Sequence, residues 1–172
     1  MKNLLYSREK AVNYAINYTV VPNPAFKYFV LYGENGGDCT NFISQCLNAG
    51  GAPMIFSGEN PWWYSNNNTP NLSDDKWSIS WAVAGSLYWY LKNSYAKNLY
   101  GVKGKEVPSV SMLEPGDIIS YQDSKGIIAH SAIITSFDDY GNPLIAQHTP
   151  NVLNIPYIKS WAAKIFFLKI SL

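Results

Sequence analysis

Apolar residues recur at helical spacing through the first half of the chain. Residues 7–18 and residues 38–49 each place apolar side chains three and four positions apart, which is typical of helices with one buried face. Residues 78–93 are apolar on most sides and predict a helix that is largely buried. Residues 52–77 are rich in Pro, Gly, Asn and Ser, so we expect a long irregular surface segment between the second and third helices.

The pattern changes to strand-like alternation after the turn signal LEPGD at residues 113–117. The expected strands contain the sequences IISYQ, AHSAIITSF, PLIAQHT and KIFFLKI, and DDYGNP between the second and third is expected to form a hairpin loop. Helices followed by a run of antiparallel strands define the α+β class. We therefore expect N-terminal helices packed on a C-terminal antiparallel β-sheet.

Composition and charge exclude several kinds of partner. The 172 residues are 47% hydrophobic and 15% charged, so residues 1–172 are expected to form a single domain with its own core. The formal net charge is +1 and the basic residues are scattered, which argues against a nucleic-acid partner. The sequence shows no signal-peptide pattern and no apolar run of about 18 residues, so no membrane partner is expected. A monomer is expected, and the compartment stays open.

Two cysteines lie on the second expected helix, and their positions on it favour different roles. They are seven positions apart, roughly 10 Å along a helix, which is too far for a disulfide. Cys39 falls in the first turn, where free N–H groups and the helix dipole favour a thiolate. Its place on the apolar face also fits a small buried hydrophobe. Cys46 lies in mid-helix without that advantage, and we assign it to the core.

The two histidines fall at matching ends of neighbouring expected strands. His130 lies near the start of AHSAIITSF and His148 near the end of PLIAQHT, so antiparallel pairing would bring both to one rim of the sheet. With Cys39 nearby they could form a nucleophile, a base and an orienting group. A structural or surface role for each histidine is the alternative. The cysteine and histidine spacings match no common zinc motif, and neither a metal nor a cofactor is expected.

Six blocks of sequence follow one another in a characteristic order: REKAVNYA, GGDCTNFISQCLNAGGAPM, WSISWAVAGSLYWYLK, LEPGDIISY, HSAIIT and PLIAQHTPN. Together they resemble the putative amidase domain family, a branch of the papain-like cysteine peptidases. The shorter combination of DCT, PGD and HSA is also similar to the NlpC-type cell-wall peptidases and their cysteine- and histidine-dependent amidohydrolase relatives. The resemblance covers nearly the whole chain and implies a papain-like, NlpC-type fold.

The resemblance also implies roles for individual residues. Cys39 would be the nucleophile, His130 the general base and acid, and His148 the polar residue that orients the imidazole. Asp38 would be a neighbour of the site, although a role as the acidic N-cap of the helix fits the sequence equally well. The aromatic residues Trp62, Trp63 and Tyr64 could line the substrate groove or simply cover the helices.

The leading hypothesis is a cysteine-dependent amidohydrolase or peptidase that works through a thioester acyl-enzyme. The resemblance to cell-wall enzymes implies an amide in the peptide stem of bacterial peptidoglycan, hence action outside the cytoplasm, with a peptide as the partner. An acyltransferase or transamidase on the same scaffold is the second hypothesis. A non-catalytic module that binds glycopeptides through its tryptophan-rich loop is the third, and retention of both histidines beside Cys39 argues against it.

Overall fold

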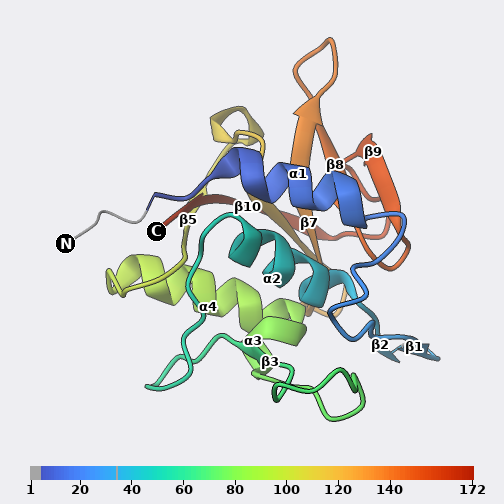
Figure 1. The fold of residues 1–172 in the computed structure, drawn as a ribbon. Coiled ribbons are helices and arrows are strands. Elements are labelled where there is room, and N and C mark those ends of the chain that lie inside the picture. The colour runs from blue at the N-terminus through green and yellow to red at the C-terminus, as the bar shows by residue number, and fades with distance from the viewer. Residues whose placement is uncertain (1–4, 34) are drawn as a thin grey trace.

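The helices of the protein gather on one side of its largest sheet. We describe residues 5–33 and 35–172 from a computed structural model. The helical segments are α1 (Arg8–Tyr18), α2 (Cys39–Ala49), α3 (Ile79–Ala82), α4 (Ala84–Ala96) and the 3₁₀ turn η1 (Val110–Met112). Figure 1 shows α1, α2 and α4 lying across the sheet, with α2 between the other two. Among the described residues, no helix combines the length and apolar character that a membrane crossing needs.

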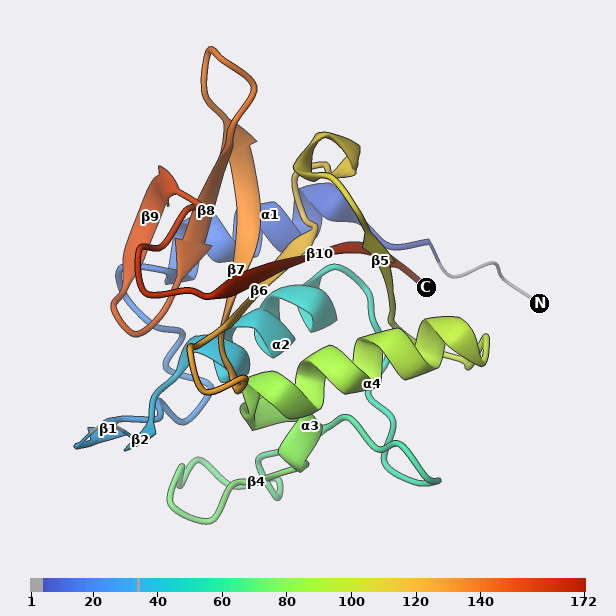
Figure 2. The same cartoon turned by 180° about the vertical axis from the view of Figure 1, so that it is seen from behind.

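The main sheet is antiparallel throughout, with strand order β5-β10-β6-β7-β8-β9. Its strands are β5 (Lys103–Val107), β6 (Ile118–Gln122), β7 (Ile128–Phe137), β8 (Pro143–Gln147), β9 (Val152–Pro156) and β10 (Lys164–Ser171). Figure 2 shows this sheet from the side that the helices leave uncovered. Two small hairpins pair β1 (Leu31–Tyr32) with β2 (Asn35–Gly36) and β3 (Tyr64–Ser65) with β4 (Lys76–Trp77). The α+β prediction is confirmed.

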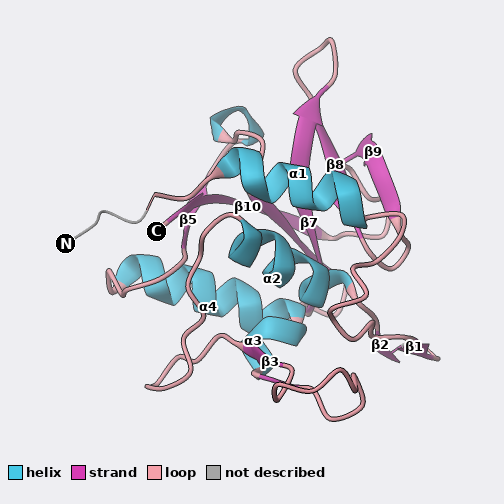
Figure 3. Cartoon of the chain, viewed as in Figure 1, coloured by secondary structure: helices cyan, strands magenta, loops and turns pink. Residues whose placement is uncertain are grey.

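The helix expected over residues 78–93 is interrupted. Val83 adopts an extended backbone with φ −114° and ψ 125°, so α3 ends before it and α4 starts after it. This break was not predicted, because apolar spacing alone does not reveal a single extended residue. Strands β5 and β9 were also missed, since each is short and borders segments that read as loop (Figure 3). The other expected helices and strands are confirmed within a few residues.

Strand alternation divides the apolar side chains into two cores. On β7, Ile133 belongs to the core between sheet and helices, whereas Ile134 belongs to a second core on the opposite face. The second core also contains Val107, Leu113, Ile119, Tyr121, Ala132 and Ile145. Because side chains alternate along a strand, this division fixes which face each polar residue of β7 and β8 occupies.

The PGD motif fastens α1 to the sheet. Asp117 is fully buried and accepts hydrogen bonds from the guanidinium of Arg8 at 2.6 Å and from the backbone N–H of Ile170 at 2.8 Å. Gly116 has φ +90°, and a Cβ there would lie 3.2 Å from Arg8, so glycine lets the turn pass close to the helix. The motif therefore acts through structure, holding the helix layer against the sheet.

Candidate active site

Cys39 is the first residue of α2 and lies against the strand that carries His130. Only 8% of Cys39 is exposed, and its Sγ lies 3.6 Å from Thr40 Oγ1 and beside the backbone N–H of Ser131. The preceding Gly37 has φ +100°, and a Cβ there would lie 3.0 Å from Thr149, so the chain approaches β8 closely before α2 begins. Burial raises the pKa of the Cys39 thiol, outweighing the hydrogen bonds that lower it.

His130 lies near the start of β7, on the face of the sheet opposite the helices. It is 7% exposed and packs beside the rings of Tyr121 and Trp161, with centroids 5.7 and 6.3 Å away. Burial lowers the pKa of His130 to about 4; the Gln147 side chain acts in the opposite sense, and the Lys159 cation lowers it further. At neutral pH the imidazole is therefore uncharged and able to accept a proton.

Gln147, which the sequence analysis did not select, is the polar neighbour of His130. Ile145 pairs with Ile134 in the second core, so Gln147, two residues further, shares that face with His130. Gln147 is 2% exposed, and its Oε1 accepts a hydrogen bond from Lys159 Nζ. The side-chain nitrogen of Gln147 lies 3.4 Å from the carbonyl of Pro150. Counting in steps of two from the strand core would have found this residue.

His148 does not orient His130, and this part of the expected arrangement is not formed. Its Nδ1 is hydrogen-bonded to Asp38 Oδ2, and its Nε2 lies 2.9 Å from the carbonyl oxygen of Tyr18. The ring also stacks on Phe42 with centroids 4.0 Å apart. The reason is the strand period: His148 follows Gln147 and so faces the helix side. It joins the end of α1, the start of α2 and the end of β8.

Asp38 lies next to Cys39, and its side chain is buried and hydrogen-bonded within the protein. It is 1% exposed, and besides His148 its carboxylate accepts hydrogen bonds from Phe29 N and Asn41 Nδ2, each at 2.8 Å. Its own backbone N–H donates to Thr149 Oγ1 at 2.8 Å. Both side-chain oxygens of Asp38 thus have hydrogen-bond partners within the protein, and the sequence-based assignment of Asp38 to substrate binding has no support from this geometry.

Trp62, Trp63 and Tyr64 do not line the groove beside Cys39. Trp62 is fully buried, donates from its indole to Ser44 Oγ at 3.1 Å and packs against Trp81. Tyr64 is 5% exposed and accepts a hydrogen bond from the backbone N–H of Lys27 at 2.8 Å. Trp63 stacks on Phe56. Trp62 and Tyr64 belong to the core that contains residues of α2 and α4, which agrees with the alternative that these aromatic residues cover the helices.

A groove of about 630 Å³ opens at Cys39. Its walls come from the segment around β1 and β2, the junction of α3 and α4, and the turn that enters β7. The lining residues are Lys27, Tyr28, Phe29, Val30, Tyr32, Gly36, Gly37, Cys39, Thr40, Trp77, Ala82, Val83, Ala84, Ile127, Ile128 and Ala129. Here Tyr28, Phe29 and Trp77 occupy the place expected for the aromatic triplet.

Cys39 and His130 reach the same rim of the sheet without a direct hydrogen bond. The Cys39 sulfur lies against Ser131, the residue that follows His130, while the buried Nε2 of His130 has no well-formed hydrogen bond within the described residues. Lys159 interacts electrostatically with both Cys39 and His130. A thiol, an imidazole, an amide and an ammonium group thus gather at one place, and thiol–imidazole hydrogen bonds are often long before substrate binds.

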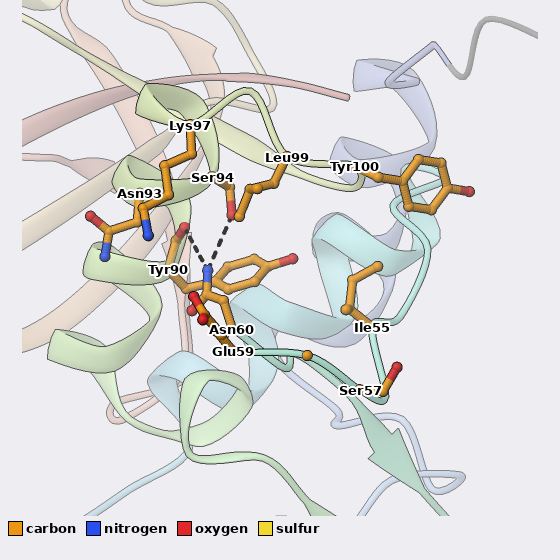
Figure 4. Close-up of a pocket in the computed structure, with 11 residues that line it drawn as sticks. Ile55, Ser57, Glu59, Asn60, Tyr90, Asn93, Ser94, Lys97, Leu99 and Tyr100 are labelled. Atoms are coloured by element: carbon orange, nitrogen blue, oxygen red, sulfur yellow. Dashed lines mark hydrogen bonds between the residues drawn. The ribbon is translucent and has the colours of Figure 1, made fainter.

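A second pocket lies away from this cluster, between α4 and the segment before β3. Figure 4 shows Asn60 held there by the carbonyl of Tyr90 and the hydroxyl of Ser94, at 3.5 and 3.3 Å. Its volume is about 380 Å³, and none of its described lining residues is a cysteine or a histidine. It offers polar contacts but neither a thiol nor an imidazole, so the chemistry is assigned to the groove at Cys39.

Comparison with known proteins finds a matching family model and two relatives. The family model described as "Putative amidase domain" matches residues 5–169. "Uncharacterized protein YhbB" of Bacillus subtilis (strain 168) is 38% identical over 147 residues, which cover 84% of this chain and 42% of that protein. "Uncharacterized protein YjcM" of the same strain is 29% identical over 160 residues, or 88% of this chain and 32% of that protein. The chain thus spans less than half the length of these relatives, and no solved structure matches it significantly.

Proposed function

Because this chain belongs to the putative amidase domain family, which indicates amide hydrolysis in general, we propose that it hydrolyses an amide bond with Cys39 as the nucleophile. The single observation that supports this most strongly is the placement of Cys39. It lies at the first turn of α2, against the strand that carries a buried neutral histidine, and it lines an open groove. A purely structural cysteine would need neither the groove nor the histidine.

The proposed reaction starts from a neutral thiol and a neutral imidazole. As the Cys39 sulfur attacks the amide carbonyl, His130 takes the thiol proton, and the carbonyl oxygen becomes an oxyanion. The backbone N–H groups in the first turn of α2 have no partner within the helix, so they are the proposed donors to that oxyanion. Collapse of the intermediate breaks the C–N bond, and His130 returns its proton to the departing amine.

Hydrolysis of the thioester completes the proposed cycle. Water attacks the acyl carbon while His130 accepts one of its protons. The C–S bond then breaks, the carboxylic acid is released, and the proton passes from His130 to the Cys39 sulfur, which restores the thiol. Gln147 is the residue we propose to orient the imidazole, in place of His148. Its amide lies on the same face as His130, and Lys159 fixes Gln147 in turn.

The proposal extends to the fold relationship and to the substrate. A papain-like, NlpC-type relationship would explain the order of Cys39, His130 and a polar residue on the next strand. A peptide stem of peptidoglycan as substrate has only the resemblance to cell-wall peptidases in its favour. Transfer to an amine or hydroxyl in place of water would use the same groups, and a binding module without turnover would use only the groove.

The test is amide turnover in matched variants. Purified protein is incubated with a library of peptide amides and with peptidoglycan fragments, and the released amine is quantified. We expect Cys39→Ala and His130→Ala to lose at least about 1,000-fold in rate, while Cys46→Ala, which changes the buried cysteine on the same helix, stays folded and active. Activity that survives in Cys39→Ala would contradict the proposal.

A further inference from the structure

Part of the exposed apolar surface of this protein lies around Cys39. Each of the following has an exposed large side chain and lines the groove: Tyr28, Val30, Tyr32, Val83 and Ile127. Their exposed fractions run from 38% for Tyr28 to 77% for Tyr32. Single exposed apolar residues are ordinary, but a contiguous set around a nucleophile marks a surface that an apolar ligand covers.

These residues come from three separate parts of the chain. Tyr28, Val30 and Tyr32 precede or belong to β1, Val83 lies between α3 and α4, and Ile127 precedes β7. The extended backbone at Val83 interrupts an otherwise continuous helix and leaves that side chain half exposed beside the groove. At this place the Val83 side chain is available to contact an apolar part of a ligand.

The groove also carries positive charge and no negative charge among its described lining residues. Among its described lining residues, Lys27 is the only charged one, and there is no carboxylate. The Lys27 ammonium lies over the ring of Trp77, 5.6 Å from its centroid, and Trp77 packs on Phe29. A basic substrate side chain would find no partner here and would meet a like charge, whereas a carboxylate would be tolerated.

We propose, on the basis of the proposed function, that the groove selects amides whose acyl part carries a large aliphatic or aromatic side chain next to the scissile carbonyl. Such a side chain would cover the apolar walls while the carbonyl reaches Cys39. Peptides with leucine-like or phenylalanine-like residues are therefore the substrate class, and lysine-like residues are excluded.

The selection is measured with two series of compounds that share one set of side chains. Acetyl-aminoacyl coumarin amides with Leu, Phe, Ala, Glu or Lys give kcat/KM, and the matching acetyl-aminoacyl chloromethyl ketones give the rate of Cys39 alkylation by mass spectrometry. We expect Leu and Phe to exceed Ala by at least about 10-fold in either series, and Lys to be slowest. The alkylation series needs no turnover, so it reports on the groove even when the leaving group is unsuitable.

Substitutions in the groove walls test whether these residues cause the preference for Leu over Ala. Val83→Ser and Ile127→Ser should each reduce the Leu-to-Ala ratio by about 5-fold or more, because each removes part of an apolar wall. Ile79→Ser is the control: Ile79 is 71% exposed on α3 but does not line the groove, so its ratio should match the wild type. Ratios within one variant are unaffected by the fraction of protein that folds.

The two proposals fail in different ways. Equal rates for Leu, Ala and Lys probes, with Cys39 still alkylated, would overturn the apolar selection and leave the proposed function standing. Faster reaction of the Glu probe than of the Leu probe would overturn it in favour of an acidic peptide. If Cys39 reacts with none of the ketones while iodoacetamide labels the unfolded protein fully, both proposals are overturned together.

Discussion

At the scale of single residues, the site combines two groups whose environment keeps both of them neutral. The sequence favours a thiolate at Cys39, because the residue begins a helix. In the folded protein burial raises the pKa of the Cys39 thiol and lowers the pKa of His130 to about 4. Both shifts oppose charge, so the resting pair is a thiol and an imidazole. The proton therefore moves during the attack on substrate.

The pH dependence of kcat/KM tests this neutral pair. His130 must be unprotonated to accept the thiol proton, so activity is expected to fall only as the pH drops through about 4. Alkylation of Cys39 by iodoacetamide should remain slow at pH 6 and rise in the alkaline range. An acid limb near 6.5, the ordinary pKa of histidine, or rapid alkylation at pH 6 would contradict the neutral pair.

Gln147 is tested by a substitution that adds charge without adding bulk. Gln147→Glu places a carboxylate beside His130, which should raise the pKa of the imidazole and move the acid limb of kcat/KM upward by about one unit or more. Gln147→Ala should lower kcat by roughly 10- to 100-fold with little change in KM. Gln122→Ala, on strand β6, which is separated from β8 by β7, is the control and should change neither quantity. An unmoved acid limb in Gln147→Glu would exclude the orienting role.

At the scale of elements, the Asp38–His148 pair joins the helix layer to the sheet. It connects the residue before α2 with the residue after β8, and His148 also contacts the carbonyl of Tyr18 at the end of α1. These three element ends meet at Asp38 and His148, and Asp38 directly precedes the nucleophile in the sequence. The pair thus fixes where α2 begins, and with it the position of the Cys39 sulfur.

The two histidines should therefore respond differently to replacement. His148→Ala leaves a buried oxygen of Asp38 without its hydrogen-bond partner, which should lower the free energy of unfolding by about 1–3 kcal/mol, and loss of the ring stacked on Phe42 should lower it further. His130→Ala removes a buried ring whose Nε2 has no well-formed hydrogen bond among the described residues, and should cost less than about 2 kcal/mol while abolishing activity. Urea unfolding of both variants measures this. A smaller loss for His148→Ala than for His130→Ala would contradict the structural role of His148.

The sequence pattern predicted most of the helices and main-sheet strands but not which residue of β8 lies beside His130. Helical spacing predicted α1 and α2, and alternation predicted β6, β7, β8 and β10, because those patterns depend on local periods of 3.6 and 2. The sequence analysis chose His148 and not Gln147 as the partner of His130. Alternate residues of β8 face opposite sides of the sheet, and the sequence pattern did not show which set faces which core. Which set faces which core is decided by pairing with β7, including an irregular register between Ile134 and Ser136.

At the scale of the whole molecule, the active-site cluster lies where two layers meet. Cys39 comes from the helix layer and His130 from the uncovered face of the sheet, so the site exists only when α2 is packed on β7. The groove adds a third contribution, from the irregular segments around β1 and α3. Those walls were not predictable from the sequence, because each is formed by residues remote from one another along the chain. Composition could show only that enough apolar residues were present.

The most direct test of the central claim is to trap the acyl-enzyme. An activated ester of an acetyl-leucine compound is mixed with the protein, quenched in acid within milliseconds to seconds, and digested for mass spectrometry. We predict one acyl group on the peptide that contains Cys39, absent in Cys39→Ala, retained in Cys46→Ala and formed at least about 100-fold more slowly in His130→Ala. Turnover of the ester without any acyl group on Cys39, undiminished in Cys39→Ala, would contradict the assignment of Cys39 as the nucleophile.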